Sequence, residues 1–389
     1  MYRKTYAVVD GDILKNNIIE IKNKYNGYEY YIGVVKNNAY NHGIYVVNDL
    51  IAGGINYLAV SSLEEALNIR KYNMSIPILC LEPIELEYIY DAINNNVTIT
   101  VENLNYIQAL NELKLQDILK IHLKIDSGMS RLGIKSSNEL KKIIKIINEN
   151  KKMYLEGIYS HFATSGVSDK NWDLQLANFK AITSEIELKN IPIVHLGRSL
   201  TLVNHPKIDF CNGIRLGIVM YGFAQNINKG NFIQELKRNF IVKKYNISET
   251  SRNNNLQLRT AFCLYTKVIS IRKLNEGECV GYNAIYKAKE PVYIATLPIG
   301  YADGVDKKFG FVSIRGKKYE IIADTMDMLM IKVDKNIKIG DKVEIFGNNI
   351  KIKEVTSKIG VNAYHLFNQI TNRVPRIHIR EGYEEEIKY

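Results

Sequence analysis

The stretch YYIGVVKNNAYNHG (residues 30–43) decides the fold, because an apolar run ends abruptly at a lysine. Residues 30–35 have the character of a short buried strand, and Lys36 stands where that strand ends. Two amides, a tyrosine and a glycine follow, which favours a loop. An ammonium group beside a buried strand is costly unless it is paired or has a use. The stretch therefore predicts a strand whose carboxyl end carries a reactive group.

The same pattern recurs along the first half of the chain, where short apolar runs alternate with stretches of helical period. These runs predict strands at residues 30–35, 57–60, 77–81, 97–101, 119–125, 155–160, 191–196 and 210–217. Amphipathic stretches between them, such as SNELKKIIKIINEN, predict helices. Eight strands separated by helices match the count of a (β/α)8 barrel. We therefore expect an α/β fold with an N-terminal TIM-type barrel over residues 11–224.

The pattern changes near Gln225. Residues 225–256 are polar and rich in asparagine, which predicts a long loop or linker. Residues 257–389 consist of short β runs separated by turns that contain glycine. We expect a mainly β C-terminal domain, with residues 1–10 as a candidate strand that pairs with it.

The composition excludes several classes of protein. A chain of 389 residues with 46% hydrophobic residues can bury a full core and predicts two domains. The net charge is +11, but the lysines are interleaved with glutamates, so we expect a solvated surface and no nucleic-acid partner. No segment reaches the roughly 18 apolar residues that span a bilayer, which predicts a soluble, cytoplasmic protein without a membrane partner. The four cysteines include no CxxC pair, which favours reduced, buried thiols and no metal site.

In a barrel of this type the chemistry gathers where the strands end, so the residues at those positions are candidates for a site. They are Lys36, Asp126, Arg131, His161, His195, Ser199, Arg215 and Gly217. Taken singly, each has an ordinary explanation: a histidine at a strand end is more often structural, and a lysine usually reaches solvent. Together they predict one reactive rim.

Lys36 then has a reason for its position. A lysine at the mouth of an apolar barrel is partly desolvated, which disfavours the ammonium form and leaves an amine able to form a Schiff base. Ser199 and Gly217 follow the seventh and eighth strands, where barrels commonly bind a phosphate. A Schiff-base lysine together with a phosphate site predicts pyridoxal 5'-phosphate as the cofactor.

These motifs resemble the pyridoxal-phosphate-dependent alanine racemases. The resemblance runs through almost the whole chain, in order and at similar spacing, in VVKNNAYNHG, HLKIDSGMSRLGI, GIYSHFATS, IRLGIVMYG, CVGYNAIY, LPIGYADG, DTMDM and NRVPR. It implies that Lys36 holds the cofactor and acts as the base on one face of the substrate. Tyr282, contributed by the partner subunit, would act on the other face, because racemisation must remove a proton from one side and return it to the other. A homodimer with shared active sites follows.

The resemblance assigns further roles around the cofactor. Arg215 would pair with the pyridine nitrogen and keep it unprotonated. Arg131 would bind the phenolic oxygen of the cofactor and the substrate carboxylate. Lys124 matches a lysine that is carbamylated in many members, although an unmodified lysine remains the alternative. The phosphate would be bound by Tyr40, Ser199, Gly217, Ile218 and Tyr364.

Other positions have supporting roles by the same resemblance. His161 would couple an arginine to the catalytic tyrosine, Met326 would contact the substrate carboxylate from the partner subunit, and Tyr301 would line the entrance. Asp303 and His195 are expected to be scaffold.

The chain also departs from the family pattern. Arg198 replaces a usual asparagine before the phosphate-binding serine, Asn37 adds bulk beside the cofactor, and Thr325 replaces a usual cysteine. These changes bear on the substrate more than on the chemistry.

The resulting hypothesis is an amino-acid racemase that interconverts L- and D-alanine and supplies D-alanine for peptidoglycan. A serine or broad-specificity racemase would use the same residues, since one methylene changes discrimination by only roughly 1–3 kcal/mol. A pyridoxal-phosphate decarboxylase would leave Tyr282 unexplained. A non-catalytic cofactor-binding protein would have no need of the second domain with GYNAIY and DTMDM.

Overall fold

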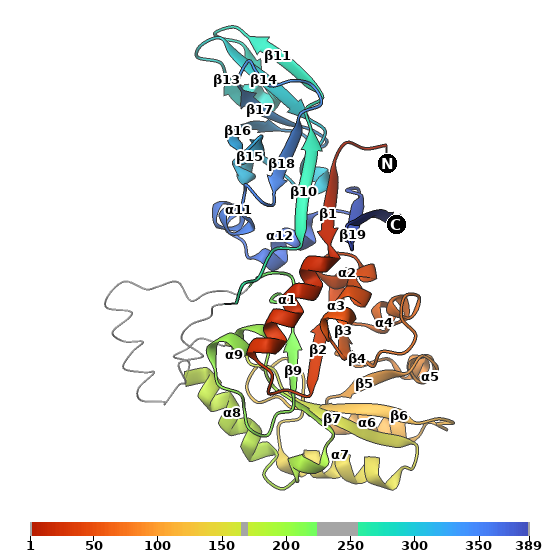
Figure 1. Cartoon of the computed structure of the whole chain (residues 1–389). Coiled ribbons are helices and arrows are strands. Elements are labelled where there is room, and N and C mark those ends of the chain that lie inside the picture. Colours follow the sequence, from red (N-terminus) through yellow and green to blue (C-terminus); the bar gives the residue numbers. More distant parts are fainter. Residues whose placement is uncertain (1, 165–169, 224–255, 388–389) are drawn as a thin grey trace. The chain divides into compact units, whose positions relative to one another are not determined.

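The computed structural model describes residues 2–164, 170–223 and 256–387, and its elements are shown in Figure 1. The chain divides into two compact units. The barrel unit comprises Lys15–Ala39 and Ile44–Leu258, and the β unit comprises Met1–Leu14, Tyr40–Gly43 and Arg259–Tyr389. Residues 225–255 of the predicted linker lie outside the described residues. Within the described residues, no helix is long and apolar enough to cross a membrane.

The barrel unit contains eight parallel strands, as the sequence predicted. They are β2 (Tyr30–Val34), β3 (Tyr57–Val60), β4 (Ile78–Cys80), β5 (Val97–Val101), β6 (Leu119–Lys124), β7 (Met153–Tyr159), β8 (Ile193–His195) and β9 (Gly213–Leu216). Their order in the sheet is β8-β7-β6-β5-β4-β3-β2-β9. The strands at the two ends of this order, β8 and β9, meet where the N–H of Arg215 donates to the carbonyl of Gly197 at 3.2 Å. This contact closes the sheet into a barrel.

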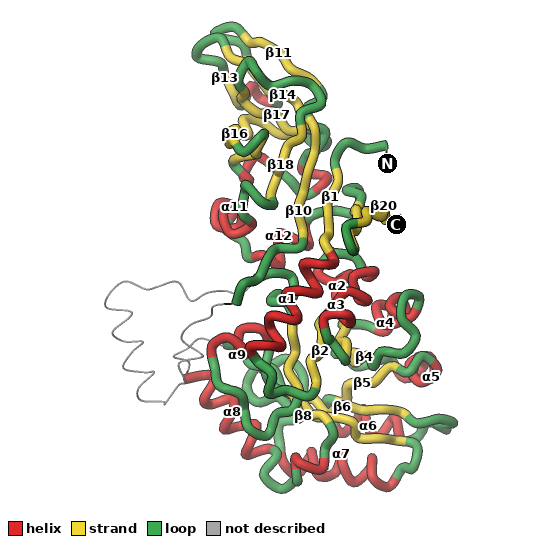
Figure 2. The backbone as a smooth tube through the Cα atoms, viewed as in Figure 1, coloured by secondary structure: helices red, strands yellow, loops and turns green. Residues whose placement is uncertain are grey.

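Helices alternate with these strands, which is plain in the red and yellow segments of Figure 2. They are α1 (Gly11–Lys24), α3 (Val47–Gly53), α4 (Leu63–Arg70), α5 (Ile89–Asn94), α6 (Leu104–Asn111), α7 (Ser137–Glu149), α8 (Lys170–Ile182) and α9 (Ser199–Asn204). Helix α7 shows why such segments fold as helices. The hydroxyl of Ser136 accepts from the N–H of Glu139 at 3.2 Å and caps the first turn. Leu140, Ile143 and Ile147 are buried on one helical face.

The interior of the barrel is more polar than the sequence predicted. The expectation of an apolar barrel is wrong, because His122, Tyr159, His195 and Arg215 are buried in the strands together with Lys124. These aromatic and long polar side chains fill the interior of the barrel. Tyr159 stacks on His195 with ring centroids 4.9 Å apart and an interplanar angle of 8°. Such groups are tolerated inside only when they bond to one another.

The segment after β2 forms a left-handed helical turn that the sequence analysis did not foresee. Helix α2 (Lys36–Tyr40) carries positive φ angles at Asn37 (51°), Asn38 (52°), Ala39 (54°) and Tyr40 (52°). Asparagine tolerates this conformation, whereas alanine and tyrosine are strained in it by roughly 1–2 kcal/mol each. The run of asparagines in the opening motif is therefore a backbone requirement. Strain of this kind is typical of functional sites.

The β unit is built around a ten-stranded sheet with the order β11-β14-β17-β16-β15-β18-β10-β1-β19-β20. The strands are β1 (Tyr6–Asp10), β10 (Phe262–Lys267), β11 (Ser270–Leu274), β14 (Val292–Leu297), β15 (Phe311–Ile314), β16 (Lys317–Asp324), β17 (Leu329–Val333), β18 (Lys342–Phe346), β19 (Arg376–Arg380) and β20 (Tyr383–Ile387). The N-terminal strand β1 pairs antiparallel with β10 and parallel with β19. The first segment of the chain thus belongs to the last unit.

Smaller elements complete the β unit. Strands β12 (Cys279–Val280) and β13 (Tyr286–Lys287) form a separate hairpin. Two helices, α11 (Ile352–Ile359) and α12 (Ala363–Gln369), interrupt the β pattern, so the unit is mainly β, as the sequence predicted. The cysteines are free, as expected, but only Cys80 and Cys211 are buried: Cys263 is half-buried and Cys279 is exposed.

Candidate active site

The barrel topology brings most of the predicted site residues to one rim. Lys36 follows β2, Asp126 follows β6, His161 follows β7, and Ser199 follows β8. Because the strands are parallel, their carboxyl ends meet at the same end of the barrel. Arg215 lies within β9, one residue before its end.

Arg215 makes many hydrogen bonds at this end. Its Nη1 donates to Nδ1 of His195 at 2.7 Å and to the carbonyl of His195 at 2.8 Å. Its Nη2 donates to the carbonyls of Ser160 at 2.6 Å and Leu196 at 3.0 Å, and lies 3.3 Å from Nδ1 of His161. Burial lowers the pKa of Arg215 to about 10, which leaves the guanidinium charged at neutral pH. Among the described residues, none of these bonds goes to a carboxylate.

Other cations surround Arg215. Burial, followed by the charges of Arg215 and Arg131, lowers the pKa of Lys124 to about 7. Burial and the charges of Arg215 and Arg198 hold the pKa of His161 well below its usual range. Each shift has the sign expected when a cation must form beside other cations. The barrel mouth is therefore strongly electropositive.

The carboxylate of Asp126, which follows β6, is already engaged. Oδ1 of Asp126 accepts from the N–H groups of Gly128, Met129 and Ser130 at 3.1, 3.0 and 3.0 Å. Burial opposes its ionisation, but these bonds lower the pKa of Asp126 overall. The carboxylate thus organises the loop after β6. Because its charge is held by these backbone donors, it neutralises little of the positive charge at the barrel mouth.

The residues present fit an anionic cofactor with a phosphate group. Ser199 and Gly217 lie side by side, because the N–H of Gly217 donates to Oγ of Ser199 at 2.9 Å. Both are buried, as is Ile218. Hydroxyl and backbone N–H groups after the last two barrel strands are common phosphate ligands. Arg198, which stands where the family pattern has an asparagine, is half-buried and adjacent to Ser199. Its charge contributes to the lowered pKa values of Arg215 and His161.

Lys36 is half-buried at the start of the left-handed turn. The N–H of Asn37 donates to Oε1 of Glu65 at 2.5 Å, and Oε2 of Glu65 accepts from the N–H of Ser61 at 2.8 Å. A carboxylate from α4 therefore ties the backbone beside Lys36 to the end of β3. Arg131, by contrast, is exposed in the loop after β6.

The remaining predicted site residues belong to the β unit. Tyr40 and Tyr364 are in contact, with ring centroids 5.4 Å apart. The loops that carry Tyr301 and Met326 are joined by a hydrogen bond from the N–H of Ala302 to the carbonyl of Met326 at 3.0 Å. Tyr282 lies in the turn of the β12–β13 hairpin and is 74% exposed. Lys36 and Tyr282 thus belong to different units.

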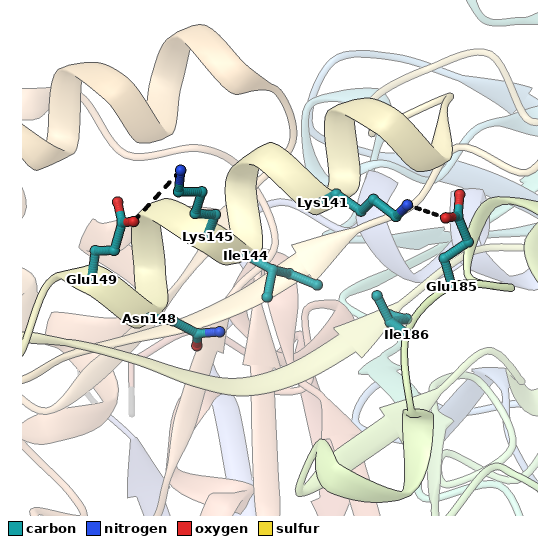
Figure 3. A pocket seen from close by; sticks show the side chains of 7 residues that line it. All are labelled: Lys141, Ile144, Lys145, Asn148, Glu149, Glu185 and Ile186. Carbon is teal, nitrogen blue, oxygen red and sulfur yellow. Dashed lines mark hydrogen bonds and ion pairs between the residues drawn. The ribbon is translucent and has the colours of Figure 1, made fainter.

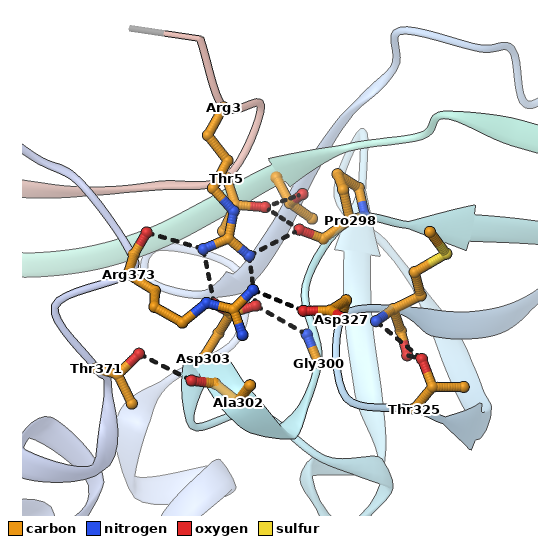
Figure 4. Close-up of polar contacts among 12 residues, drawn as sticks. Arg3, Thr5, Pro298, Gly300, Ala302, Asp303, Thr325, Asp327, Thr371 and Arg373 are labelled. Atoms are coloured by element: carbon orange, nitrogen blue, oxygen red, sulfur yellow. Dashed lines mark hydrogen bonds and ion pairs between the residues drawn. The ribbon is translucent and has the colours of Figure 1, made fainter.

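An ion-pair network under the Tyr301 loop is a feature that sequence reasoning missed (Figure 4). Arg3 donates from both terminal nitrogens to the two oxygens of Asp303, at 2.6 and 2.5 Å. Asp303 is fully buried, and Nε of Arg373 lies 3.7 Å from it. Arg373 in turn donates to Asp327 at 2.6 Å. The network fixes the loops that carry Tyr301 and Met326, and no local sequence signal links residue 3 to residue 303.

The pocket shown in Figure 3 is not part of this site. It is lined by α7 and by the segment that contains Glu185 and Ile186. Lys141 pairs with Glu185, and Lys145 lies 3.7 Å from Glu149. Exposed ion pairs of this kind contribute little to stability or recognition.

A parallel barrel with an electropositive mouth, linked in sequence to a mainly β unit, defines a class of enzyme that handles an anionic ligand at the ends of its strands. Comparisons with known proteins identify the family within this class of enzymes. Residues 9–225 match the N-terminal domain of alanine racemase, and residues 261–378 match its C-terminal domain.

Relatives match along the whole length. Alanine racemase 1 of Bacillus subtilis is 30% identical, with 100% of this chain and 96% of the relative covered. Alanine racemase of Listeria innocua is 34% identical, with 97% and 98% covered. A crystal structure of alanine racemase from Bacillus anthracis superposes with a TM-score of 0.86 at 31% identity, over 100% of this chain and 98% of that one. The chain belongs to the alanine racemase family and is an amino-acid racemase.

Proposed function

We propose that the chain interconverts L- and D-alanine with pyridoxal 5'-phosphate as its cofactor. The observation that carries this proposal is Arg215, a buried guanidinium whose described hydrogen-bond acceptors are all uncharged carbonyls and imidazoles. A permanent cation in that position disfavours protonation of a neighbouring pyridine nitrogen. That property suits a racemase, in which the substrate carbon must recover a proton rather than lose its electrons to the ring.

When bound, pyridoxal phosphate supplies an aldehyde that links to an amine and a ring that weakens the Cα–H bond of the substrate. In this chain Lys36 would provide the linking amine. Ser199, Gly217 and Ile218 would bind the phosphate, together with Tyr40 and Tyr364 by family resemblance. The electropositive barrel mouth supports this assignment, because phosphate and phenolate oxygens both carry negative charge.

The substrate would be oriented by its carboxylate. Arg131 is exposed at the rim and free to swing onto a ligand, and Met326 would offer its backbone N–H. His161, held neutral among the cations, would accept a hydrogen bond and couple the arginine to the catalytic tyrosine. Lys124 would be carbamylated. Its lowered pKa supports this, since only an uncharged amine attacks carbon dioxide.

Proton transfer would use two groups on opposite faces of the substrate. Lys36 would serve one face and Tyr282 of a second copy of the chain the other, each holding or accepting a proton at Cα. Tyr282 is 74% exposed, which supports a role that another chain completes.

We propose a homodimer for the same reason. Tyr282, Ile285, Tyr301, Met326 and Met328 are all large apolar residues of the β unit that are exposed by 42–74%. Hydrogen bonds join two of the loops that carry them. Clusters of exposed aromatic and methionine side chains are typical of protein interfaces. A dimer that covers them would also deliver Tyr282 to a second barrel.

The biological role would be the supply of D-alanine for peptidoglycan in the cytoplasm. A serine or broad-specificity racemase is the main alternative, since Asn37, Arg198 and Thr325 change the surroundings of the site. These residues would alter the pocket and leave the proton-transfer groups in place.

A chiral assay of the purified protein decides between these functions. L-alanine, L-serine, L-lysine and L-ornithine would be incubated separately, and the D-enantiomers measured. We expect alanine to have the highest kcat/KM. Equal rates on serine would support the broad-specificity racemase, and carbon dioxide release without D-amino acid would refute racemisation.

A further inference from the structure

A chain of contacts runs through the interior of the barrel from Arg215 to a carboxylate on β7. Nη1 of Arg215 lies 2.7 Å from Nδ1 of His195, and Nε2 of His195 lies 2.9 Å from Nδ1 of His122. Nε2 of His122 then lies 3.3 Å from Oε2 of Glu156. The last contact has the distance of an ion pair but departs from ideal hydrogen-bond alignment, and no other described group accepts from that nitrogen. Both histidine rings are completely buried.

The two ends of this chain fix the direction of every bond in it. A guanidinium can only donate, so Nδ1 of His195 must accept. A neutral imidazole with an accepting Nδ1 carries its proton on Nε2, which then donates to His122. The same reasoning places the proton of His122 on Nε2, facing Glu156. A carboxylate can only accept, so the chain ends consistently.

The charge states agree with this arrangement. Burial lowers the pKa of His122 and holds that of His195 well below its usual range, so both rings are neutral. Burial alone would raise the pKa of Glu156, but hydrogen bonds lower it to about 2. The hydroxyls of Tyr57 and Thr98 donate to Oε2 at 2.6 and 2.8 Å. Glu156 is therefore an ionised carboxylate held in place by several donors.

The backbone is shaped to admit the His122 ring. A Cβ atom at position 157 would lie 2.5–2.6 Å from the ring of His122, so only glycine fits there. The pairing of β6 with β7 shifts register between Ile121 and His122, which places His122 opposite Gly157. A bulge of this kind re-aims a side chain.

We propose that Glu156, His122 and His195 form a relay that anchors Arg215, with Glu156 as its anionic end. The relay fixes one tautomer of each imidazole and thereby holds the guanidinium in one orientation. It also supplies a remote negative charge to an arginine that has no direct carboxylate partner among the described residues. Glu156 and His122 are positioning residues, since they act through Arg215. Their relevance to catalysis rests on the role proposed above for Arg215 at the cofactor.

Removal of the carboxylate has a defined consequence. A glutamine at position 156 can donate to Nε2 of His122, which moves the proton of that ring to Nδ1. The shift passes to His195, whose Nδ1 then carries a proton toward Nη1 of Arg215. Two donors facing each other repel, so the guanidinium loses its bond to the ring.

The direct test is nitrogen-15 NMR of the histidine side chains in the holoenzyme, labelled at histidine. Signals of His122 and His195 would be assigned from the spectra of His122→Asn and His195→Asn. We expect both rings to be neutral with the proton on Nε2. A proton on Nδ1 of either ring, or a doubly protonated ring, would overturn the relay. This measurement needs no stable variant at position 156.

Glu156→Gln tests whether the relay matters for the reaction. We expect it to shift the His122 signal toward the Nδ1–H form and to lower kcat for alanine by about tenfold, as partners that orient a binding group commonly do. The KM for alanine should stay within about twofold. Glu156→Asp, which keeps the charge, should recover part of the loss. An unchanged His122 signal together with an unchanged kcat would overturn the proposal.

Lys120→Gln is the matched control. Nζ of Lys120 lies 4.0 Å from Oε1 of Glu156 and is partly exposed, so this variant removes an outside neighbour of the carboxylate and leaves the relay intact. We expect unchanged spectra and an unchanged kcat. If Glu156→Gln also left the spectra and kcat unchanged, Glu156 would have only a packing role. Failure of the wild type to racemise alanine would refute the proposed function without affecting the NMR result.

Discussion

The barrel mouth and the exposed loops of the β unit place their proposed site residues in opposite environments. Arg215 is 3% and Lys124 is 4% exposed, whereas Tyr282 is 74% and Met326 is 53% exposed. The barrel residues derive their chemistry from burial and from one another within a single chain. Tyr282 and Met326 of the β unit, by contrast, are largely apolar side chains exposed to solvent. The difference fits the proposed function, in which the barrel residues act within one chain and the exposed residues act on a second copy.

Lys36→Ala tests the barrel side of this comparison and should have the largest effect. Without the amine the cofactor has no covalent attachment and the substrate loses one base, so we expect racemase activity to fall by at least about a thousandfold. The visible absorbance of the lysine-linked cofactor should disappear as well. Lys71→Ala, at an exposed lysine, serves as the control. Retained absorbance and activity would remove Lys36 from the site.

Tyr282→Phe tests the exposed side. Loss of the phenolic hydroxyl should lower kcat for L-alanine by roughly 100- to 10,000-fold, because a general acid–base group typically contributes that much. The cofactor should stay bound, since its contacts belong to other residues. Tyr383→Phe removes a hydroxyl from a comparably exposed tyrosine of the β unit and should have no effect. Equal rates for the two variants would show that Tyr282 is not a base.

Lys124→Met measures how much the burial of this lysine among other cations lowers the free energy of unfolding. The pKa of this lysine falls to about 7 in the folded chain and is about 10.4 in an unfolded one, so below pH 7 folding carries the full cost of burying its charge. That cost, at most about 5 kcal/mol, declines as the pH rises from 7 to 10. In buffer free of carbon dioxide, Lys124→Met should therefore raise the free energy of unfolding more at pH 6.5 than at pH 9.

Lys142→Met, at an exposed position of α7, is the control for that measurement. Denaturant unfolding at the two pH values would give the difference directly. A gain for Lys124→Met that does not depend on pH would mean that the folded-state pKa is not depressed.

Arg3→Ala tests the scaffold beneath the exposed loops and should have the smallest effect. It leaves the buried carboxylate of Asp303 with Arg373 at 3.7 Å and the N–H of Gly300 at 3.1 Å. We expect a loss of about 2–3 kcal/mol in the free energy of unfolding, less than for a buried ion pair left with no partner. Arg272→Ala, an exposed arginine on β11, should change stability by less than about 0.5 kcal/mol. A similar small change for Arg3→Ala would mean that the network does not fix the loops.

The sequence predicted the order of the barrel strands well, because a strand buried on both faces is a short apolar run bounded by polar residues. It also predicted which residues follow the strands, since parallel topology then places them at one end. It did not predict the left-handed turn at residues 37–41, because asparagine is common in ordinary loops as well. The two β-unit helices were missed because each is short, with few positions to establish a helical period.

The polar interior was missed for a different reason. His122 and Lys124 alternate with isoleucine and leucine in LKIHLK, which resembles a strand with one solvent-exposed face. In a barrel the second face points into the lumen, where side chains from strands that are not paired with each other can meet. Contacts such as His122 with His195, 73 positions apart, leave no local signal.

The central claim is that each active site takes Lys36 from one chain and Tyr282 from another. The most direct test is to unfold, mix and refold the inactive variants Lys36→Ala and Tyr282→Phe and to assay alanine racemisation. A shared site predicts that mixed dimers each contain one intact pair, so activity should return to about a quarter of the wild-type value. Mixtures that remain inactive, although mixed dimers have formed, would contradict the account.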